Sequence, residues 1–227
     1  MLLVGLTGTI GSGKSTVSKF LREEGNIVIV DADELAKTVV EPGRSAYTQL
    51  RREFGDEYFD DDSDGRLKRD RLAALVFHDQ EKRHKLNSIV HPAVAKEIVI
   101  QIVKNALSFE NILILDVPLL FESGMDRYVQ RTIVVSWQET QIERIMGRDG
   151  MSDSDARARI ETQMSTAEKI QRATYVVDNN GSLEETRIQV KKIIADLKSS
   201  RQPFIIRVVI ITTVMLTALL LSCKFLL

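Results

Sequence analysis

The feature of the sequence that most constrains its fold is a glycine-rich stretch close to the N-terminus. The residues from Gly8 to Ser15 read Gly-Thr-Ile-Gly-Ser-Gly-Lys-Ser and fit the phosphate-binding pattern G-x-x-x-x-G-K-[ST]. An apolar run, residues 1–7, precedes the stretch, and residues 14–24 follow it with the apolar spacing of a helix. Strand, glycine-rich loop and helix in this order are typical of phosphate binding, because glycines let backbone N–H groups turn toward an anion at a helix N-terminus.

Two side chains of this loop have a defined chemical role in such sites. Lys14 is expected to reach the β and γ phosphates of a nucleotide, and the Ser15 hydroxyl is expected to ligate Mg²⁺. Gly11 and Gly13 also begin a dinucleotide-binding fingerprint, but no third glycine follows at the required spacing. The predicted nucleotide-binding residues of the loop are therefore Gly8, Thr9, Ile10, Gly11, Ser12, Gly13, Lys14, Ser15 and Thr16.

Apolar runs of strand length recur along the chain. They are continuous rather than alternating, as in the strands of a parallel sheet that is covered on both faces. The sequence therefore predicts a three-layer α/β fold with about five parallel strands. The expected strands are residues 1–7, 27–30, 111–116, 131–135 and 174–177.

The segments between these strands are predicted to be mostly helical. Three or four helical segments are expected between about residues 33 and 108, with His91–Pro92 marking a helix start, and they form a helical insertion beside the sheet. Residues 138–148 and 182–198 have amphipathic helical spacing. The charged stretch of about residues 149–172 is typical of the lid of a small-molecule kinase.

Acidic residues at the ends of two predicted strands are candidates for catalysis. The Asp116 carboxylate is expected at the carboxyl edge of the sheet, where it could hold Mg²⁺ through water or cap the strand end. One of Asp31 and Asp33, after the second strand, could act as a general base toward an acceptor hydroxyl. Either could instead be the N-cap of a helix beginning at Glu34, and spacing alone leaves these alternatives open.

Two arginines on the helix before the charged stretch are candidates for binding phosphate. Arg144 and Arg148 lie four residues apart and share one helical face, so both guanidinium groups could point at a transferring phosphoryl group. Glu143 and Asp149 allow the alternative of a salt-bridged surface.

Composition argues against several other kinds of site. The 31 Lys and Arg residues nearly balance the 32 Asp and Glu residues, so no polybasic surface dominates and no nucleic-acid partner is expected. The single Cys excludes an intramolecular disulfide framework, and the three His residues lack metal-ligand spacing. The acidic run of residues 60–65 opens like a calcium loop, but Arg71 stands where a bidentate Glu is needed, so we expect a solvated loop.

Several strings of the sequence, taken together, resemble the dephospho-CoA kinase family. The resemblance covers nearly all of residues 1–198, with two departures, Thr9 in place of a usual Gly and Lys37 in place of a usual Arg. The strings are Gly5 to Thr16, Asp31 to Ala36, His91-Pro92, Asp116-Val-Pro-Leu-Leu-Phe-Glu122, the lid pattern Arg144-x-x-x-Arg148-Asp-Gly followed by Gln163, and Val177 to Leu183.

This resemblance implies a fold, a reaction and a set of site residues. The fold is that of the P-loop nucleoside-monophosphate kinases, with a helical CoA-binding insertion and a lid, and the reaction moves the γ phosphate of ATP to the ribose 3′-hydroxyl of dephospho-CoA. Asp33 falls on the family's catalytic acid, and Asn179 and Asn180 fall on the loop beside the adenine. The residues implied in catalysis are Asp33, Lys14, Arg144 and Arg148, those implied in binding dephospho-CoA are His91, Leu119, Leu120, Phe121 and Glu122, and those implied in holding Mg²⁺ are Ser15 and Asp116.

Two other functions remain as alternatives. A different nucleoside or nucleotide kinase would share the same loop, and a nucleotide-switched membrane adaptor would bind ATP without phosphotransfer. A pure switch has no need for a catalytic acid at Asp33 or for lid arginines, which disfavours the adaptor.

The last residues of the chain have the composition of a membrane span. Residues 204–227 are mostly apolar and contain two charged residues, Arg207 and Lys224. A helix of about 20 apolar residues crosses the hydrocarbon core of a bilayer. We expect a C-terminal transmembrane helix that anchors the kinase domain, residues 1–200, with that domain facing the cytosol. The alternative is an apolar helix that packs on a partner or lies in the membrane interface, and the choice of membrane and the oligomeric state stay open.

Overall fold

The structure is a computed structural model that describes residues 1–60, 65–108, 110–137 and 163–200. The chain divides into two compact units. The first consists of Met1–Ile29 and Asn105–Leu227, and the second is Val30–Lys104. Each is described by itself below.

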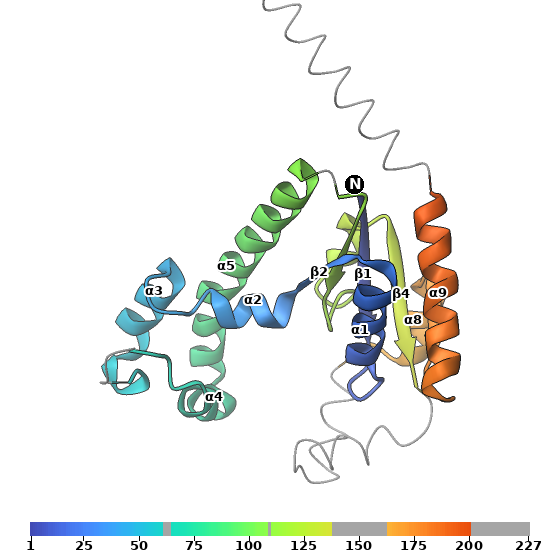
Figure 1. The fold of residues 1–227 in the computed structure, drawn as a ribbon. Coiled ribbons are helices and arrows are strands. Elements are labelled where there is room, and N and C mark those ends of the chain that lie inside the picture. The colour runs from blue at the N-terminus through green and yellow to red at the C-terminus, as the bar shows by residue number, and fades with distance from the viewer. Residues whose placement is uncertain (61–64, 109, 138–162, 201–227) are drawn as a thin grey trace, which may run out of the picture. The chain divides into compact units, whose positions relative to one another are not determined.

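A five-stranded sheet organises the first unit, with strand order β2-β3-β1-β4-β5 (Figure 1). β1 pairs in parallel with β3 and β4, and β4 pairs in parallel with β5. The five-stranded parallel sheet predicted from the apolar runs is therefore confirmed. The strands are β1 (Leu2–Gly8), β2 (Val28–Asp31), β3 (Ile112–Asp116), β4 (Arg131–Ser136) and β5 (Tyr175–Asp178), and β2 straddles the boundary between the two units.

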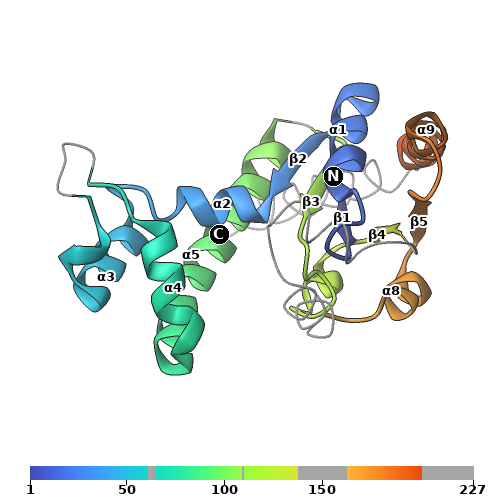
Figure 2. The ribbon, with the colours of Figure 1, turned by 90° about the horizontal axis from the view of Figure 1, so that it is seen from below.

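Helices cover both faces of this sheet. α1 (Lys14–Gly25) and α9 (Leu183–Ser199) lie on one face, and α8 (Thr166–Arg172) lies on the other (Figure 2). Alternate residues of β1, among them Leu2 and Leu6, point toward α1 and α9 and share one hydrophobic cluster with Leu21 and Leu197. Burying each such leucine stabilises the fold by roughly 1.5–3 kcal/mol.

The strand order determines where on the sheet the glycine-rich loop lies. β1 lies between β3 and β4, so the chain leaves β1 toward one side of the sheet for β2 and β3 and reaches the other side with β4. Leu6 of β1 is in register with Asp116 of β3, and Gly8 is in register with Val135 of β4. Ligands of open α/β sheets bind at the carboxyl ends of strands where the order reverses, and the glycine-rich loop begins at this point.

Helices make up the described part of the second unit. Its small hydrophobic cluster is formed by Val39, Val40, Tyr47, Leu50 and Phe59, with the rings of Tyr47 and Phe59 edge to face at 5.1 Å between centroids. Several apolar side chains in the first half of α5 pack against this cluster. The helices are α2 (Ala32–Thr38), α3 (Ser45–Phe54), the 3₁₀ turn η1 (Asp56–Tyr58), α4 (Arg69–His78) and α5 (Gln80–Leu107), which runs slightly past the unit.

The prediction that His91–Pro92 marks a helix start is wrong. Both residues lie inside α5, which continues for 28 residues around Pro92. Proline lacks the N–H that would bond the carbonyl of Ser88, so the helix loses one bond there. The apolar side chains around Pro92, among them Val90 and Val94, pack against the cluster of the unit, and this tertiary contact outweighs the local preference.

Several predicted segments lie outside the described residues. They are the helix of residues 138–148, the lid up to residue 162 and the C-terminal transmembrane helix of residues 204–227. Within the described part of the chain, α5 has the length and apolar composition of a membrane span. In the second unit, apolar side chains of α5 pack against the hydrophobic cluster described above.

Candidate active site

The glycine-rich loop joins β1 to α1 as predicted, and two of its glycines are required by geometry. Gly13 is the N-cap of α1 with φ of 83°, and a Cβ there would stand 2.0 Å from Asn179 Nδ2. A Cβ on Gly8 would stand 2.5 Å from Ser12 Oγ and 2.9 Å from the carbonyl oxygen of Val135. Any other residue at either position would therefore displace the loop.

The N-terminal turn of α1 presents donors to this loop. The N–H groups of Thr16 and Val17 donate to the Gly13 carbonyl, as in a regular helix start. The N–H groups of Lys14 and Ser15 belong to the first turn, where a helix supplies no acceptor of its own. Together with the positive end of the helix dipole, they favour an anion such as a nucleotide phosphate.

The loop lysine and the acid at the end of β3 meet. Lys14 Nζ forms an ion pair with Asp116 Oδ1, and the Asp116 side chain is 2% exposed. The strand end thus brings a buried carboxylate to the glycine-rich loop, as the sequence predicted. A buried carboxylate needs a paired charge of this kind, because an unpaired one is strongly destabilising.

Ser15 and Asp116 fit a magnesium ion. A hydroxyl and a carboxylate are hard oxygen ligands of the type that Mg²⁺ prefers, and both residues stand at the phosphate-binding loop. Within the described residues there is no group of three or more His, Cys, Asp or Glu side chains that could hold a metal. A hydroxyl and a carboxylate supply only part of the coordination of such an ion, so phosphates and water would complete it.

Asn179 contacts the loop directly. Its Nδ2 donates to the Ser12 carbonyl at 2.8 Å, and its Oδ1 accepts from Thr186 Oγ1 at 2.8 Å. Both Asn179 and Thr186 are buried, whereas Asn180 is exposed and bonds Asp178 Oδ1. Asn179 therefore links the glycine-rich loop to α9. The sequence did not indicate Thr186 as the partner of Asn179, because no known motif pairs an Asn with a Thr seven residues later.

The two acids after β2 have different surroundings. Asp31 is the N-cap of α2, because its Oδ1 accepts from the N–H groups of Asp33 at 2.9 Å and Glu34 at 3.2 Å. The helix begins at Ala32, and Asp33 presents an exposed side chain on its first turn. Asp31 therefore serves as the cap. Asp33 lies in the second unit, as does His91, which is exposed on α5.

Lys37, the departure from the family's usual arginine, lies on the same short helix. Its Nζ pairs with Glu34 Oε1 at 2.6 Å, and this contact raises the pKa of Lys37. Arg69 Nη2 donates to the Lys37 carbonyl at 2.8 Å.

The loop after β3 combines buried residues with exposed ones, and Glu122 is among the exposed. Leu120 and Phe121 are buried, and only Leu119 of the apolar residues predicted to contact dephospho-CoA is exposed, at 44%. Glu122 Oε1 lies 2.9 Å from Lys169 Nζ and accepts the N–H of Met164 at 2.9 Å. Burial raises the pKa of Glu122, but the contacts with Lys169, its own N–H and the N–H of Met164 outweigh it, so the pKa lies below the ordinary value.

The residues of α8 were missed by the sequence argument. Lys169 and Arg172 belong to a stretch so rich in charge that its pattern indicates a solvated surface, yet Lys169 is fully buried. Their partners, Glu122 and Asp126, lie about 50 positions earlier, and no helical or strand spacing links residues so far apart. The two predicted lid arginines before that stretch, Arg144 and Arg148, lie outside the described residues.

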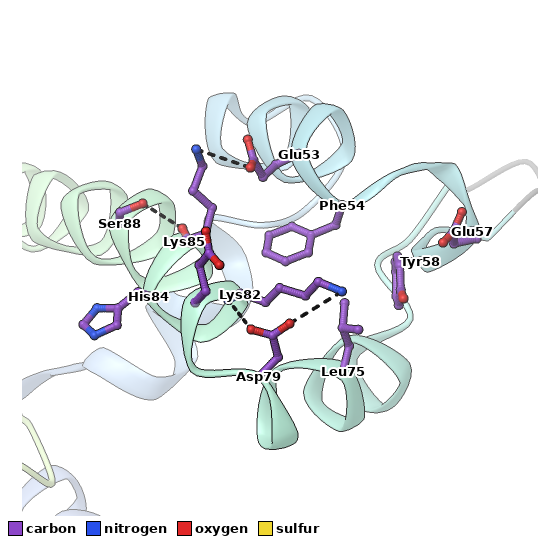
Figure 3. Close-up of a pocket in the computed structure, with 11 residues that line it drawn as sticks. Glu53, Phe54, Glu57, Tyr58, Leu75, Asp79, Lys82, His84, Lys85 and Ser88 are labelled. Carbon is purple, nitrogen blue, oxygen red and sulfur yellow. Dashed lines mark hydrogen bonds and ion pairs between the residues drawn. The ribbon is translucent and has the colours of Figure 1, made fainter.

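A cavity of about 800 Å³ lies in the second unit, between α3, η1, α4 and the start of α5 (Figure 3). Its described lining includes none of the predicted site residues. Lys82 and Lys85 line it, but their ammonium groups pair with Asp79 at 3.7 Å and with Glu53 at 3.3 Å.

The parallel sheet, the loop at its switch point and the pairing of Lys14 with Asp116 define a P-loop nucleotide-binding protein. A family model described as Dephospho-CoA kinase matches residues 2–185. The chain belongs to the dephospho-CoA kinase family, which confirms the resemblance found in the sequence.

Individual relatives align over most of this chain. A protein named Dephospho-CoA kinase from Geobacillus kaustophilus is 45% identical over 196 residues, which are 85% of this chain and 95% of that protein. An uncharacterized protein of Caenorhabditis elegans is 48% identical over 209 residues, 92% of this chain and 88% of that protein. The crystal structure of TT1252 from Thermus thermophilus has a TM-score of 0.71 and 36% identity, and covers 86% of this chain and 97% of that one.

Proposed function

We propose that this chain transfers the γ phosphate of ATP to the ribose 3′-hydroxyl of dephospho-CoA, giving ADP and coenzyme A. The observation that carries the proposal is the pairing of Lys14 with the buried Asp116 at the phosphate-binding loop, in a chain whose family match spans residues 2–185. The relative from Geobacillus kaustophilus, which carries the name of this activity, aligns over nearly its whole length.

The glycine-rich loop holds the phosphates in this proposal. The N–H groups at the start of α1 and the Lys14 ammonium bind the β and γ phosphates. Ser15 and Asp116 are the residues that would hold Mg²⁺, and the ion, when bound, neutralises charge on the phosphate oxygens. Asn179 keeps the loop in place through the Ser12 carbonyl, and the exposed Asn180 contacts the adenine.

Asp33 acts as the general base. Its carboxylate takes the proton of the ribose 3′-hydroxyl while that oxygen forms a bond to the γ phosphorus. The bond from the γ phosphorus to the bridging oxygen breaks, and ADP leaves with that oxygen. The assignment is supported by the exposed position of Asp33 and by the use of Asp31 as the helix cap.

The remaining residues bind and orient the two substrates. Arg144 and Arg148 stabilise the charge on the transferring phosphoryl group. His91 and Leu119, both exposed, contact dephospho-CoA. Leu120 and Phe121 are buried and support Leu119 from within the loop.

The purified full-length chain, given Mg²⁺ and ATP, tests the activity. We expect ADP and coenzyme A in equal amounts with dephospho-CoA, and no transfer to nucleoside monophosphates. Transfer to a nucleoside monophosphate alone would identify a different nucleotide kinase. ATP binding without transfer to any acceptor would identify a nucleotide-binding adaptor, and either result contradicts the proposal.

We also propose that residues 204–227 anchor the chain in a membrane with the kinase domain in the cytosol. The support is the run of apolar residues, long enough for a span of about 20 residues. The chain in cells should resist extraction from membranes by alkaline carbonate, and external protease should digest the kinase domain in intact organelles. Release by carbonate would instead favour a helix packed on a protein partner.

A further inference from the structure

A buried lysine on α8 has its charge partner in the loop after β3, residues 117–130, which we call the acceptor loop. Lys169 is 0% exposed, and its Nζ lies 2.9 Å from Glu122 Oε1. The same carboxylate oxygen accepts the N–H of Met164, which stands just before the capping box of α8 formed by Ser165 and Glu168. Glu122 thus contacts both the start of α8 and a residue on its buried side.

A second cation of the same helix contacts the same loop. Arg172 Nη2 pairs with Asp126 Oδ2 at 2.6 Å, and the Arg172 guanidinium lies 4.6 Å from the centroid of the Phe121 ring. Three side chains of the segment from Phe121 to Asp126 are therefore held by one helix of seven residues. The exposed Leu119 stands two residues before this segment.

We propose that Glu122 does not contact dephospho-CoA but is a positioning residue, which together with Lys169 fixes the loop after β3 so that Leu119 is presented to the acceptor. The inference rests on the proposed function, because it concerns how that acceptor is bound. It reassigns Glu122, which the sequence resemblance put among the substrate contacts.

The burial of Lys169 is the physical reason. A buried ammonium that loses its carboxylate is strongly destabilised, since its water is gone and no charge replaces it. Among the described residues, Glu122 is the carboxylate that pairs with Lys169. If Glu122 turned toward a substrate, it would leave this ammonium unpaired, so the carboxylate is kept where it is.

Two single variants and their combination test the proposal in the full-length enzyme. Glu122→Gln and Lys169→Met are each expected to raise the KM for dephospho-CoA by about tenfold or more, because the loop is misplaced, and to leave the KM for ATP within about twofold. The double variant should resemble the single variants rather than multiply their effects, because all three lose the same pair. It also leaves no buried charge unpaired, so it remains measurable if Glu122→Gln, which leaves the buried Lys169 ammonium without its carboxylate, unfolds.

Glu24→Gln is the matched control. Glu24 pairs with Arg187 and with Lys191 at 3.4 Å and joins α1 to α9 in the same unit, outside the acceptor loop. We expect its KM values for both substrates to stay at those of the unchanged chain.

Other outcomes would overturn the inference. A large rise in KM for Glu122→Gln beside an unchanged Lys169→Met, or effects that multiply in the double variant, would mean that Glu122 binds the substrate itself. Unchanged KM values in all variants would also contradict it. If the unchanged chain does not phosphorylate dephospho-CoA, the proposed function fails. The pair of Glu122 and Lys169 is then tested by the free energy of unfolding, on which the two substitutions should have coupled effects.

Discussion

Asn179 shows how a single side chain supports the phosphate-binding loop from a distant part of the sequence. Replacing it with Ala removes the donor to the buried Ser12 carbonyl and the acceptor of the buried Thr186 hydroxyl. Asn179→Ala is expected to lower the free energy of unfolding by about 1–3 kcal/mol, because buried polar groups lose their partners. It should also raise the KM for ATP, and denaturant unfolding with steady-state kinetics measures both effects.

Asn180→Ala is the control for the stability part of this prediction, since Asn180 is exposed and bonds its neighbour Asp178. Its stability should change by less than about 0.5 kcal/mol. A stable Asn179→Ala chain with an unchanged KM for ATP would mean that the contact with Ser12 has no part in nucleotide binding.

Asp33 gives a second prediction at the scale of one residue. Asp33→Asn keeps the size and the helix position of the side chain but removes the base, so turnover should fall by about 10²–10⁴-fold. ATP binding, measured by calorimetric titration, should stay the same, because the phosphates are held by the glycine-rich loop. Asp31→Asn is the matched control: asparagine caps a helix as well as aspartate does, so this variant should keep its turnover. Near-normal turnover of Asp33→Asn would contradict the assignment.

Asp31 and Asp33 also show how far residue type and position in the sequence predict the role of a side chain. Asp31 and Asp33 have the same side chain, stand two positions apart and both precede a helix, so each fits a cap and each fits a base. The difference is set by the backbone: Asp31 is extended, with φ of −91°, and its carboxylate reaches the N–H groups of the next turn, whereas Asp33 is already inside the helix. Backbone conformation at a helix boundary is not encoded by residue type alone.

At the scale of elements, the contact between the acceptor loop and α8 makes stability depend on pH. The pKa of Glu122 lies below its ordinary value of 4.5 in the folded chain. The pair with Lys169 therefore contributes its full stability above the ordinary pKa, and the contribution is lost as the pH falls through the lowered folded value. The difference in unfolding free energy between the unchanged chain and Glu122→Gln should be largest near pH 7 and shrink in acid.

Urea unfolding at two pH values measures this difference. Because a protonated Glu122 resembles a glutamine, the difference should be smaller at the pH below the ordinary pKa of a glutamate than at pH 7. A difference that is the same at both values would show that the charge of Glu122 is not what stabilises the loop.

Elements also differ in how well the sequence predicts them. The three central strands were predicted because they are rich in Val, Ile and Leu and almost wholly buried, as covering on both faces demands. The edge strands β2 and β5 are shorter and only partly buried, so their signal is weaker. The break at Pro92 was predicted wrongly, because α5 is held by packing that the local pattern does not include. The role of α8 was missed because its buried Lys169 pairs with Glu122, which lies in a distant part of the sequence. A pattern read along one helix does not include such a partner.

At the scale of the whole molecule, catalysis should not need the apolar tail. The family match ends at residue 185, and the described site residues Lys14, Ser15, Asp33, Asp116 and Asn179 all precede it. α9 ends at Ser199, and its side chains Val190, Ile193, Ile194 and Leu197 complete the core over the sheet. A chain that ends at residue 200 therefore keeps every described element.

We predict that this shortened chain has the kcat and KM values of the full-length chain in detergent, within about twofold. A chain that ends at residue 181 is the control, because it lacks α9, which covers the same face of the sheet as α1. This chain should not fold, since several buried residues of the core are removed. Circular dichroism and turnover of dephospho-CoA compare the three. A folded chain of residues 1–200 with turnover more than about tenfold below that of the full chain would mean that the tail takes part in the reaction and is more than an anchor.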